Sequence, residues 1–108
     1  MTLTFNRNPL EDRLVQKAKK YIKETYREEA WVLKVAGSAS QRSGVPDMII
    51  CLKGKFIALE FKREDGSGKA SENQLIEISK IKNSGGVSCI VSNLEDIKNI
   101  LDWVYNQR

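Results

Sequence analysis

Residues 47–62 read DMIICLKGKFIALEFK, two short apolar runs separated by the dipeptide Lys53-Gly54. Apolar runs on either side of a two-residue turn that contains glycine predict a β-hairpin. With Lys53-Gly54 as the turn, Asp47 lies directly opposite Glu60 at the open end of the hairpin. The sequence therefore predicts that two acidic side chains, far apart along the chain, meet at one end of a strand pair.

Charge gathers at this open end. Side chains that lie directly opposite each other have Cβ atoms about 4.5–5.5 Å apart and project from the same face. Lys62, two residues beyond Glu60, shares that face. Two opposed carboxylates repel unless a cation lies between them, and Mg²⁺ or Mn²⁺ would suit oxygen ligands. The alternative is an exposed strand end where Lys62 merely neutralises Glu60. A register shift of one residue would separate the acids.

The rest of the chain predicts an α/β domain. Asn8-Pro9-Leu10-Glu11 is typical of a helix start, and helix-capping patterns also begin at Ser71 and Ser92. The expected elements are a helix over 9–28, strands over 31–35, 47–52 and 55–62, a helix over 72–84, a strand over 87–91 and a last helix from about residue 93. The expected order is α-β-β-β-α-β-α, one domain with a mixed sheet flanked by helices.

Apolar spacing predicts which side chains are buried. Leu75, Ile78 and Ile81 recur at helical spacing and predict the buried stripe of the second helix. Cys51 and Cys89 both lie inside apolar runs, and two cysteines form neither a disulfide framework nor a zinc site. We expect both to be small core residues in a reduced compartment. No signal peptide or membrane span is indicated, so we expect a cytoplasmic protein.

The chain contains no histidine among its 108 residues, and its 18 basic and 14 acidic residues give a net charge of +4. The absence of histidine excludes Ser-His-Asp and Cys-His triads, a histidine general base and a histidine-ligated zinc. Any catalysis must use carboxylates, lysines, hydroxyls and a borrowed metal ion. The modest positive charge is compatible with nucleic acid but is weak support for it.

Two further polar residues have alternative interpretations. Glu11 shares a helix face with Val15, Ala18 and Ile22, so it is either a capping-box acid that reaches back to Asn8 or a buried functional group. The Ser71-x-x-Gln74 pattern predicts a capping box.

The residues also resemble a known family. Gly44-Val45-Pro46-Asp47, Glu60-Phe61-Lys62 and Ser71-Glu72-Asn73-Gln74 together resemble the PD-(D/E)XK nuclease superfamily and, within it, the virus-type replication-repair nuclease (VRR-NUC) domain. The expected order of elements is similar to the family's restriction-endonuclease-like core. The resemblance implies that residues 1–108 form a single VRR-NUC-like nuclease domain.

The resemblance implies roles for named residues. Asp47, Glu60 and the backbone carbonyl of Phe61 would bind Mg²⁺ or Mn²⁺, and Glu11 would contribute directly or through water. Lys62 would orient or help to deprotonate the attacking water. Gln74 would support the site, which is compatible with its capping role. Loop residues that could contact DNA are Arg42, Ser43 and Lys69.

The implied function is metal-dependent hydrolysis of DNA phosphodiester bonds. Stand-alone members of the family resemble Holliday junction resolvases that act as homodimers on branched DNA, and a phage or prophage origin is suggested by the family, which would place the protein in the host-cell cytoplasm. One alternative is a nuclease that prefers flaps or duplex ends. The other is a non-catalytic basic DNA-binding module, in which the acids serve only capping and ion pairing.

Overall fold

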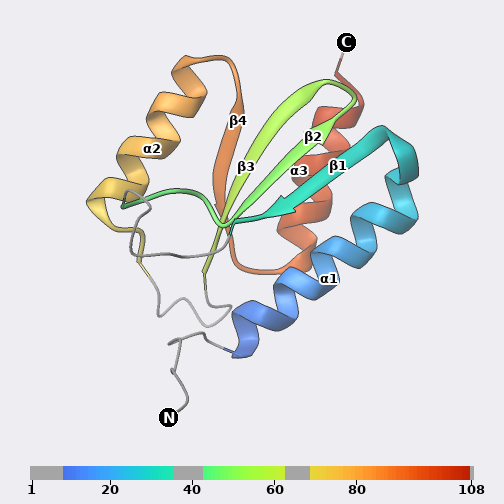
Figure 1. Ribbon diagram of the computed structural model, residues 1–108, viewed down its shortest axis with the longest axis horizontal. Coiled ribbons are helices and arrows are strands. Elements are labelled where there is room, and N and C mark those ends of the chain that lie inside the picture. The colour runs from blue at the N-terminus through green and yellow to red at the C-terminus, as the bar shows by residue number, and fades with distance from the viewer. Residues whose placement is uncertain (1–8, 36–42, 63–68, 108) are drawn as a thin grey trace.

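The computed structural model describes residues 9–35, 43–62 and 69–107, with side chains from residue 12 onward. Figure 1 shows the elements in the predicted order, with one short 3₁₀ helix added after the first helix. They are α1 (Pro9–Tyr26), η1 (Arg27–Glu29), β1 (Ala30–Lys34), β2 (Met48–Leu52), β3 (Lys55–Phe61), α2 (Glu72–Asn83), β4 (Val87–Val91) and α3 (Leu94–Tyr105). The expected mixed sheet is confirmed, since β1, β2 and β3 are antiparallel and β4 runs parallel to β3.

The predicted hairpin has the predicted register. Met48 pairs with Leu59 and Leu52 pairs with Lys55, which leaves two residues in the turn. Lys53 and Gly54 have φ angles of 50° and 82°. Positive φ at both central residues defines a type I′ turn, whose twist matches that of the flanking strands. The turn chemistry therefore fixes which residues meet at the open end of the hairpin.

The two faces of the sheet have different cover. Figure 1 shows α1 and α3 on one face and α2 on the other. Side chains that alternate along β2 and β3, including Met48, Ile50 and Leu59, are buried against α1 and α3. The intervening side chains of β3, including Glu60, face α2. The core thus fixes one face, and the polar residue Glu60 lies on the other.

The buried stripe of α2 differs from the predicted one. Ile78 is buried, but Leu75 is 50% exposed and Glu77 is buried. The stripe that faces the sheet runs through Gln74, Glu77, Ile78 and Ile81, at helical spacing. Apolar spacing missed this face because its first two members are polar.

Two smaller predictions are also corrected. Cys51 is exposed rather than in the core, because it lies on the sheet face that α1 and α3 do not cover, and α2 packs on that face over β3 and β4 rather than over β2. The last helix is capped by Asn93, whose Oδ1 accepts from the Asp96 N–H at 2.8 Å, rather than by Ser92. The Ser92 N–H instead donates to Asp96 Oδ2 at 3.2 Å. Among the described residues, no helix is long and apolar enough to span a membrane.

Candidate active site

Asp47 is held at the end of β3 by its backbone and by its side chain. Its N–H donates to the carbonyl of Leu59 at 3.0 Å, and its Oδ2 accepts from the N–H of Phe61 at 2.8 Å. Regular pairing ends at Met48, and Asp47 lies in the bend just before β2. The predicted meeting of Asp47 with the end of β3 is therefore observed, with the side chain bonded to the backbone there.

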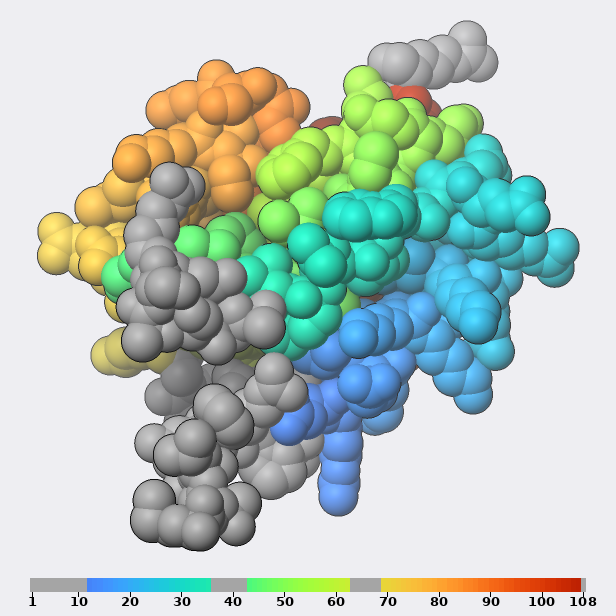
Figure 2. Space-filling model, in the orientation of Figure 1, coloured from blue at the N-terminus to red at the C-terminus, as the bar shows by residue number. Residues whose placement is uncertain are grey.

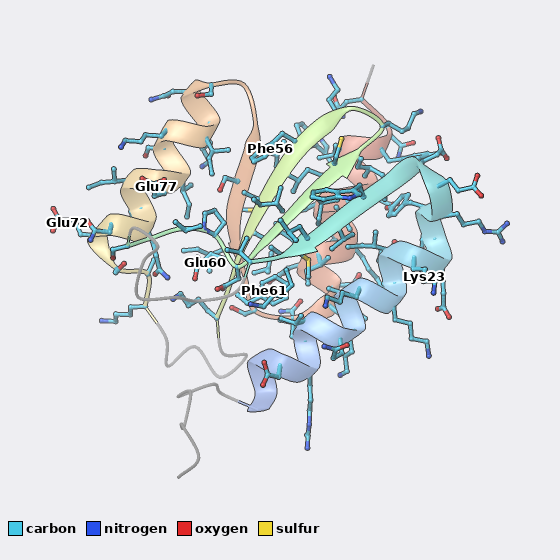
Figure 3. The ribbon with its side chains drawn as sticks, viewed as in Figure 1. Lys23, Phe56, Glu60, Phe61, Glu72 and Glu77 are labelled. Atoms are coloured by element: carbon cyan, nitrogen blue, oxygen red, sulfur yellow. The ribbon has the colours of Figure 1, made fainter. Side chains whose placement is uncertain are left out.

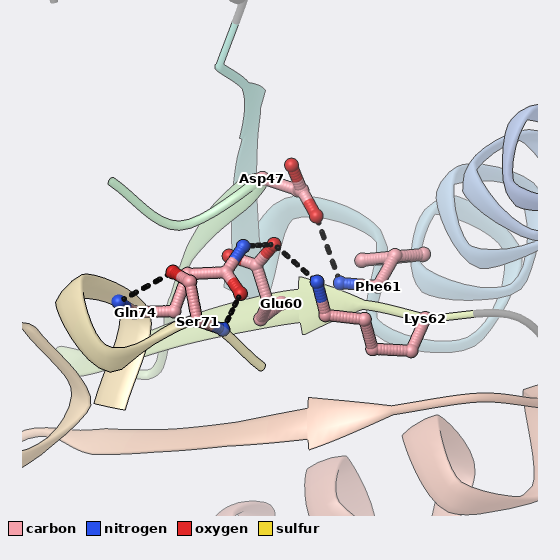
Figure 4. Close-up of polar contacts among 6 residues, drawn as sticks. All are labelled: Asp47, Glu60, Phe61, Lys62, Ser71 and Gln74. Atoms are coloured by element: carbon pink, nitrogen blue, oxygen red, sulfur yellow. Dashed lines mark hydrogen bonds and ion pairs between the residues drawn. The ribbon is translucent and has the colours of Figure 1, made fainter. Parts of the chain in front are cut away.

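Glu60 is a buried carboxylate with polar partners. Glu60 as a whole is only 5% exposed. Figure 4 shows Glu60 Oε2 accepting a 2.7 Å hydrogen bond from Gln74 Nε2 and lying 3.8 Å from Lys62 Nζ. A buried carboxylate is costly unless it is paired and hydrogen-bonded, and both kinds of partner are present. Glu60 and Lys62 lie on one face as predicted, and α2 adds the amide.

Gln74 completes the predicted capping box and also contacts Glu60. Its Oε1 accepts from the Ser71 N–H at 2.8 Å, and its own N–H donates to Ser71 Oγ at 3.1 Å, which completes the capping box. The same side chain uses its Nε2 on Glu60. The start of α2 is thus tied directly to the carboxylate on β3.

Gly44 brings the loop before Asp47 against α2. Its φ is +89°, and a Cβ at this position would lie 2.5 Å from the backbone oxygen of Asn73. Only glycine takes this conformation and this close approach without strain. The Gly44-Val45-Pro46-Asp47 motif therefore packs against the helix turn that carries Gln74.

The oxygen ligands at the end of β3 suit a hard divalent cation. Asp47 and Glu60 supply carboxylate oxygens, and Phe61, whose backbone carbonyl is the third predicted ligand, directly follows Glu60 on β3. Mg²⁺ commonly uses one or two carboxylates and keeps several water ligands. Within the described residues, no group of three or more His, Cys, Asp or Glu side chains is close enough to hold a metal. By their chemistry, the two carboxylates suit Mg²⁺ or Mn²⁺ as part of a ligand set.

The remaining predicted residues are placed as follows. Glu11 lies in the first turn of α1, and its side chain is outside the described residues, as is Arg42. Ser43 and Lys69 are described and exposed. Arg13, an exposed cation on α1 that lines a groove shared with Lys62, was not predicted from the sequence. Its spacing of four residues from Lys17 could have indicated a shared helix face.

Comparison with known proteins identifies the fold. No protein-family model matches the chain, and no curated protein matches it. A solved structure of a "VRR_NUC domain" is similar to it, with a TM-score of 0.63 and 24% sequence identity, covering 88% of this chain and 97% of that one. The chain therefore has the fold of a VRR-NUC domain, as the sequence motifs predicted.

Proposed function

We propose that this chain, which has the fold of a VRR-NUC domain, is a metal-dependent endodeoxyribonuclease with its active site at the carboxyl end of β3. The observation that carries the proposal is the convergence of Asp47, Glu60 and Lys62. Asp47 bonds the backbone of Phe61, while Lys62 lies 3.8 Å from Glu60. The similar solved structure is that of a VRR_NUC domain, and this name, which denotes a nuclease domain, supports the same activity.

Asp47, Glu60 and the Phe61 carbonyl hold a Mg²⁺ or Mn²⁺ ion in this proposal, with Glu11 as a further ligand from α1. When bound, such an ion supplies a nucleophile at neutral pH and stabilises charge on phosphate oxygens. Oxygen ligands suit these hard ions and make histidine unnecessary. The absence of histidine from the chain is consistent with this chemistry.

Lys62 and Gln74 act on either side of Glu60. The Lys62 ammonium orients the attacking water and stabilises the negative charge that develops at the phosphoryl group. Its position is restrained by the backbone bond from the Lys62 N–H to the Val91 carbonyl at 2.9 Å and by the ion pair with Glu60. Gln74 Nε2 holds one Glu60 oxygen and thereby fixes how the carboxylate is turned.

The preferred substrate in this proposal is branched DNA, cut by a homodimer. A domain of this size has little surface with which to grip a junction alone, and a two-fold dimer presents two sites. Figure 2 shows β1, β2 and β3 at the surface between α1 and α2. On this face Trp31, Leu33 and Phe56 are 57%, 46% and 45% exposed. An apolar sheet face of this kind marks an interaction site, and we assign it to a second copy of the chain.

The dimer is tested by sedimentation of the parent and of Leu33→Asp. Leu33 is half exposed, so the charge is expected to leave the folded monomer intact. The parent should sediment at about twice the mass of 12.3 kDa and the variant at the monomer mass. A parent that stays monomeric at every concentration overturns the dimer and leaves the nuclease proposal standing.

The activity is tested with labelled four-way junctions, flaps, duplex and single strands in Mg²⁺, Mn²⁺ or EDTA. We compare the parent with Glu60→Gln, which removes the charge without changing the shape of the side chain. The matched control is Glu24→Gln, an exposed acid on α1. Paired symmetric nicks in the junction support a resolvase, whereas cutting only of flaps or ends supports the alternative nuclease. Binding without cleavage of any substrate supports the non-catalytic module.

A further inference from the structure

A polar groove lies beside the candidate active site. It has a volume of about 560 Å³, within the range typical of ligand-binding clefts. Its walls come from the first half of α1, the residue that follows β3 and the turn that leads from β4 into α3. The described lining residues are Arg13, Leu14, Lys17, Lys62, Ser92, Asn93, Leu94 and Glu95.

The described residues that line this groove carry mainly positive charge. Among its described lining residues, three are cations, Arg13, Lys17 and Lys62, and one is a carboxylate, Glu95. Arg13 and Lys17 are exposed and lie one helical turn apart, so both can extend to the same ligand. A groove with this balance attracts an anion, and Arg in particular matches the geometry of phosphate oxygens.

Lys62 connects the groove to the active site. The same side chain that lies 3.8 Å from Glu60 Oε2 also lines the groove. If the reacting phosphate lies beside Glu60, the strand that carries it has a positively charged path past Lys62 toward α1. Among the described lining residues none is aromatic, so these residues offer phosphate contacts but no platform for stacking of bases.

We propose that this groove binds the phosphate backbone of the DNA strand next to the phosphate that is cut, with Arg13 and Lys17 each contacting a phosphate. This inference rests on the proposed nuclease function, because the path of the strand is inferred from Lys62, a residue of the proposed active site. Contacts of this kind position the strand and carry no direct sequence information. The groove thus favours cleavage that depends on the structure of the DNA rather than on its bases.

A matched pair of variants separates the groove from general charge. Arg13→Ala/Lys17→Ala removes two cations that line it. Lys19→Ala/Lys23→Ala removes two exposed cations at the same spacing on the same helix, which line other surface hollows of α1. Figure 3 places Lys23 on the half of α1 remote from Glu60 and Phe61. A third variant, Arg13→Lys/Lys17→Arg, retains the charge in the groove.

The experiment measures binding of labelled duplex DNA in Ca²⁺ as a function of salt concentration. Each phosphate contact contributes about 0.9 to the slope of log K against log[salt]. Removing Arg13 and Lys17 should lower the magnitude of that slope by about 1.8, while removing Lys19 and Lys23 should leave it nearly unchanged. The charge-retaining variant should behave as the parent does. Circular dichroism and thermal midpoints check that each variant is folded.

Cleavage in Mg²⁺ distinguishes failure of the groove from failure of the proposed function. The groove variant should raise KM and keep kcat near that of the parent, because the reacting residues are intact. If the salt slopes of Arg13→Ala/Lys17→Ala and Lys19→Ala/Lys23→Ala are equal, the proposal for the groove is overturned, even when the parent cuts DNA. If the parent cuts no substrate, the proposed function is overturned. In that case a lower salt slope for Arg13→Ala/Lys17→Ala alone would still support phosphate binding in the groove.

Discussion

Replacement of Gln74 by Glu tests the link between α2 and the buried carboxylate of Glu60. Glu is a normal residue at this capping-box position, so the bond to the Ser71 N–H is retained. The amide donor that lies 2.7 Å from Glu60 Oε2 is replaced by a carboxylate, which cannot donate when ionised. The variant therefore removes one contact and adds repulsion, while the helix cap stays in place.

The expected cost follows from these contacts. A hydrogen bond to a charged group contributes about 1.5–3 kcal/mol, and repulsion between two carboxylates about 4 Å apart is of the order of 4 kcal/mol at an effective dielectric constant near 20. Rotation of the new side chain toward solvent relieves part of the repulsion. We expect the free energy of unfolding to fall by roughly 2–4 kcal/mol at pH 7. Ser71→Ala, which removes only the cap, should cost about 1 kcal/mol.

The assay is urea unfolding of the parent, Gln74→Glu and Ser71→Ala in EDTA, at pH 7 and near pH 4. Protonation of either carboxyl relieves the repulsion, so the cost of Gln74→Glu should shrink at the lower pH. Ser71→Ala should cost the same at both values. The reasoning is refuted if Gln74→Glu is as stable as the parent at pH 7, or if its cost does not depend on pH.

Two further predictions concern a glycine and the thiols. Gly44→Ala should lower the thermal midpoint of unfolding more than Gly54→Ala does. Both glycines have positive φ, but only a Cβ at residue 44 would meet the backbone, 2.5 Å from the oxygen of Asn73. Equal midpoints for the two variants would contradict this prediction. Burial raises the pKa of the Cys89 thiol, and a nearby lysine partly opposes this shift. In the Leu33→Asp variant, which is expected to be monomeric, the exposed Cys51 should therefore be alkylated at least ~10-fold faster than Cys89 at pH 8. The rate for Cys89 should keep rising above pH 9, where more of its thiol is ionised, and mass spectrometry measures both rates.

The hairpin was predictable from sequence because its turn and its apolar runs agree. Lys53-Gly54 fits only a short list of turns, and a two-residue turn determines every pair along the strands. The register alone places Asp47 at the end of β3 beside Glu60, and the observed pairing agrees with it. The start of α2 was predictable as well, because the local side-chain bonds of its capping box determine where the helix begins.

Features that depend on packing between elements were harder to predict. The sequence favoured Leu75 for the buried face of α2, yet Leu75 is half exposed and Glu77 is buried. Gln74 lies on the inward face, where its amide donates to the Glu60 carboxylate at the end of β3. Cys51 is exposed because β1 and β2 lack a helix over one face, which no local pattern indicates. The groove that joins Arg13 to Lys62 brings together residues from three elements, and only the fold reveals it.

Single-turnover cleavage of a labelled four-way junction by the parent and by Asp47→Asn, titrated with Mg²⁺, tests the proposed active site most directly. Asn keeps an oxygen that can accept from the Phe61 N–H, so the loop stays in place while the charge is lost. We predict Mg²⁺-dependent cleavage by the parent and a loss of at least about 100-fold in the variant. Cleavage of the junction by Asp47→Asn at the parent's rate would contradict the proposed active site.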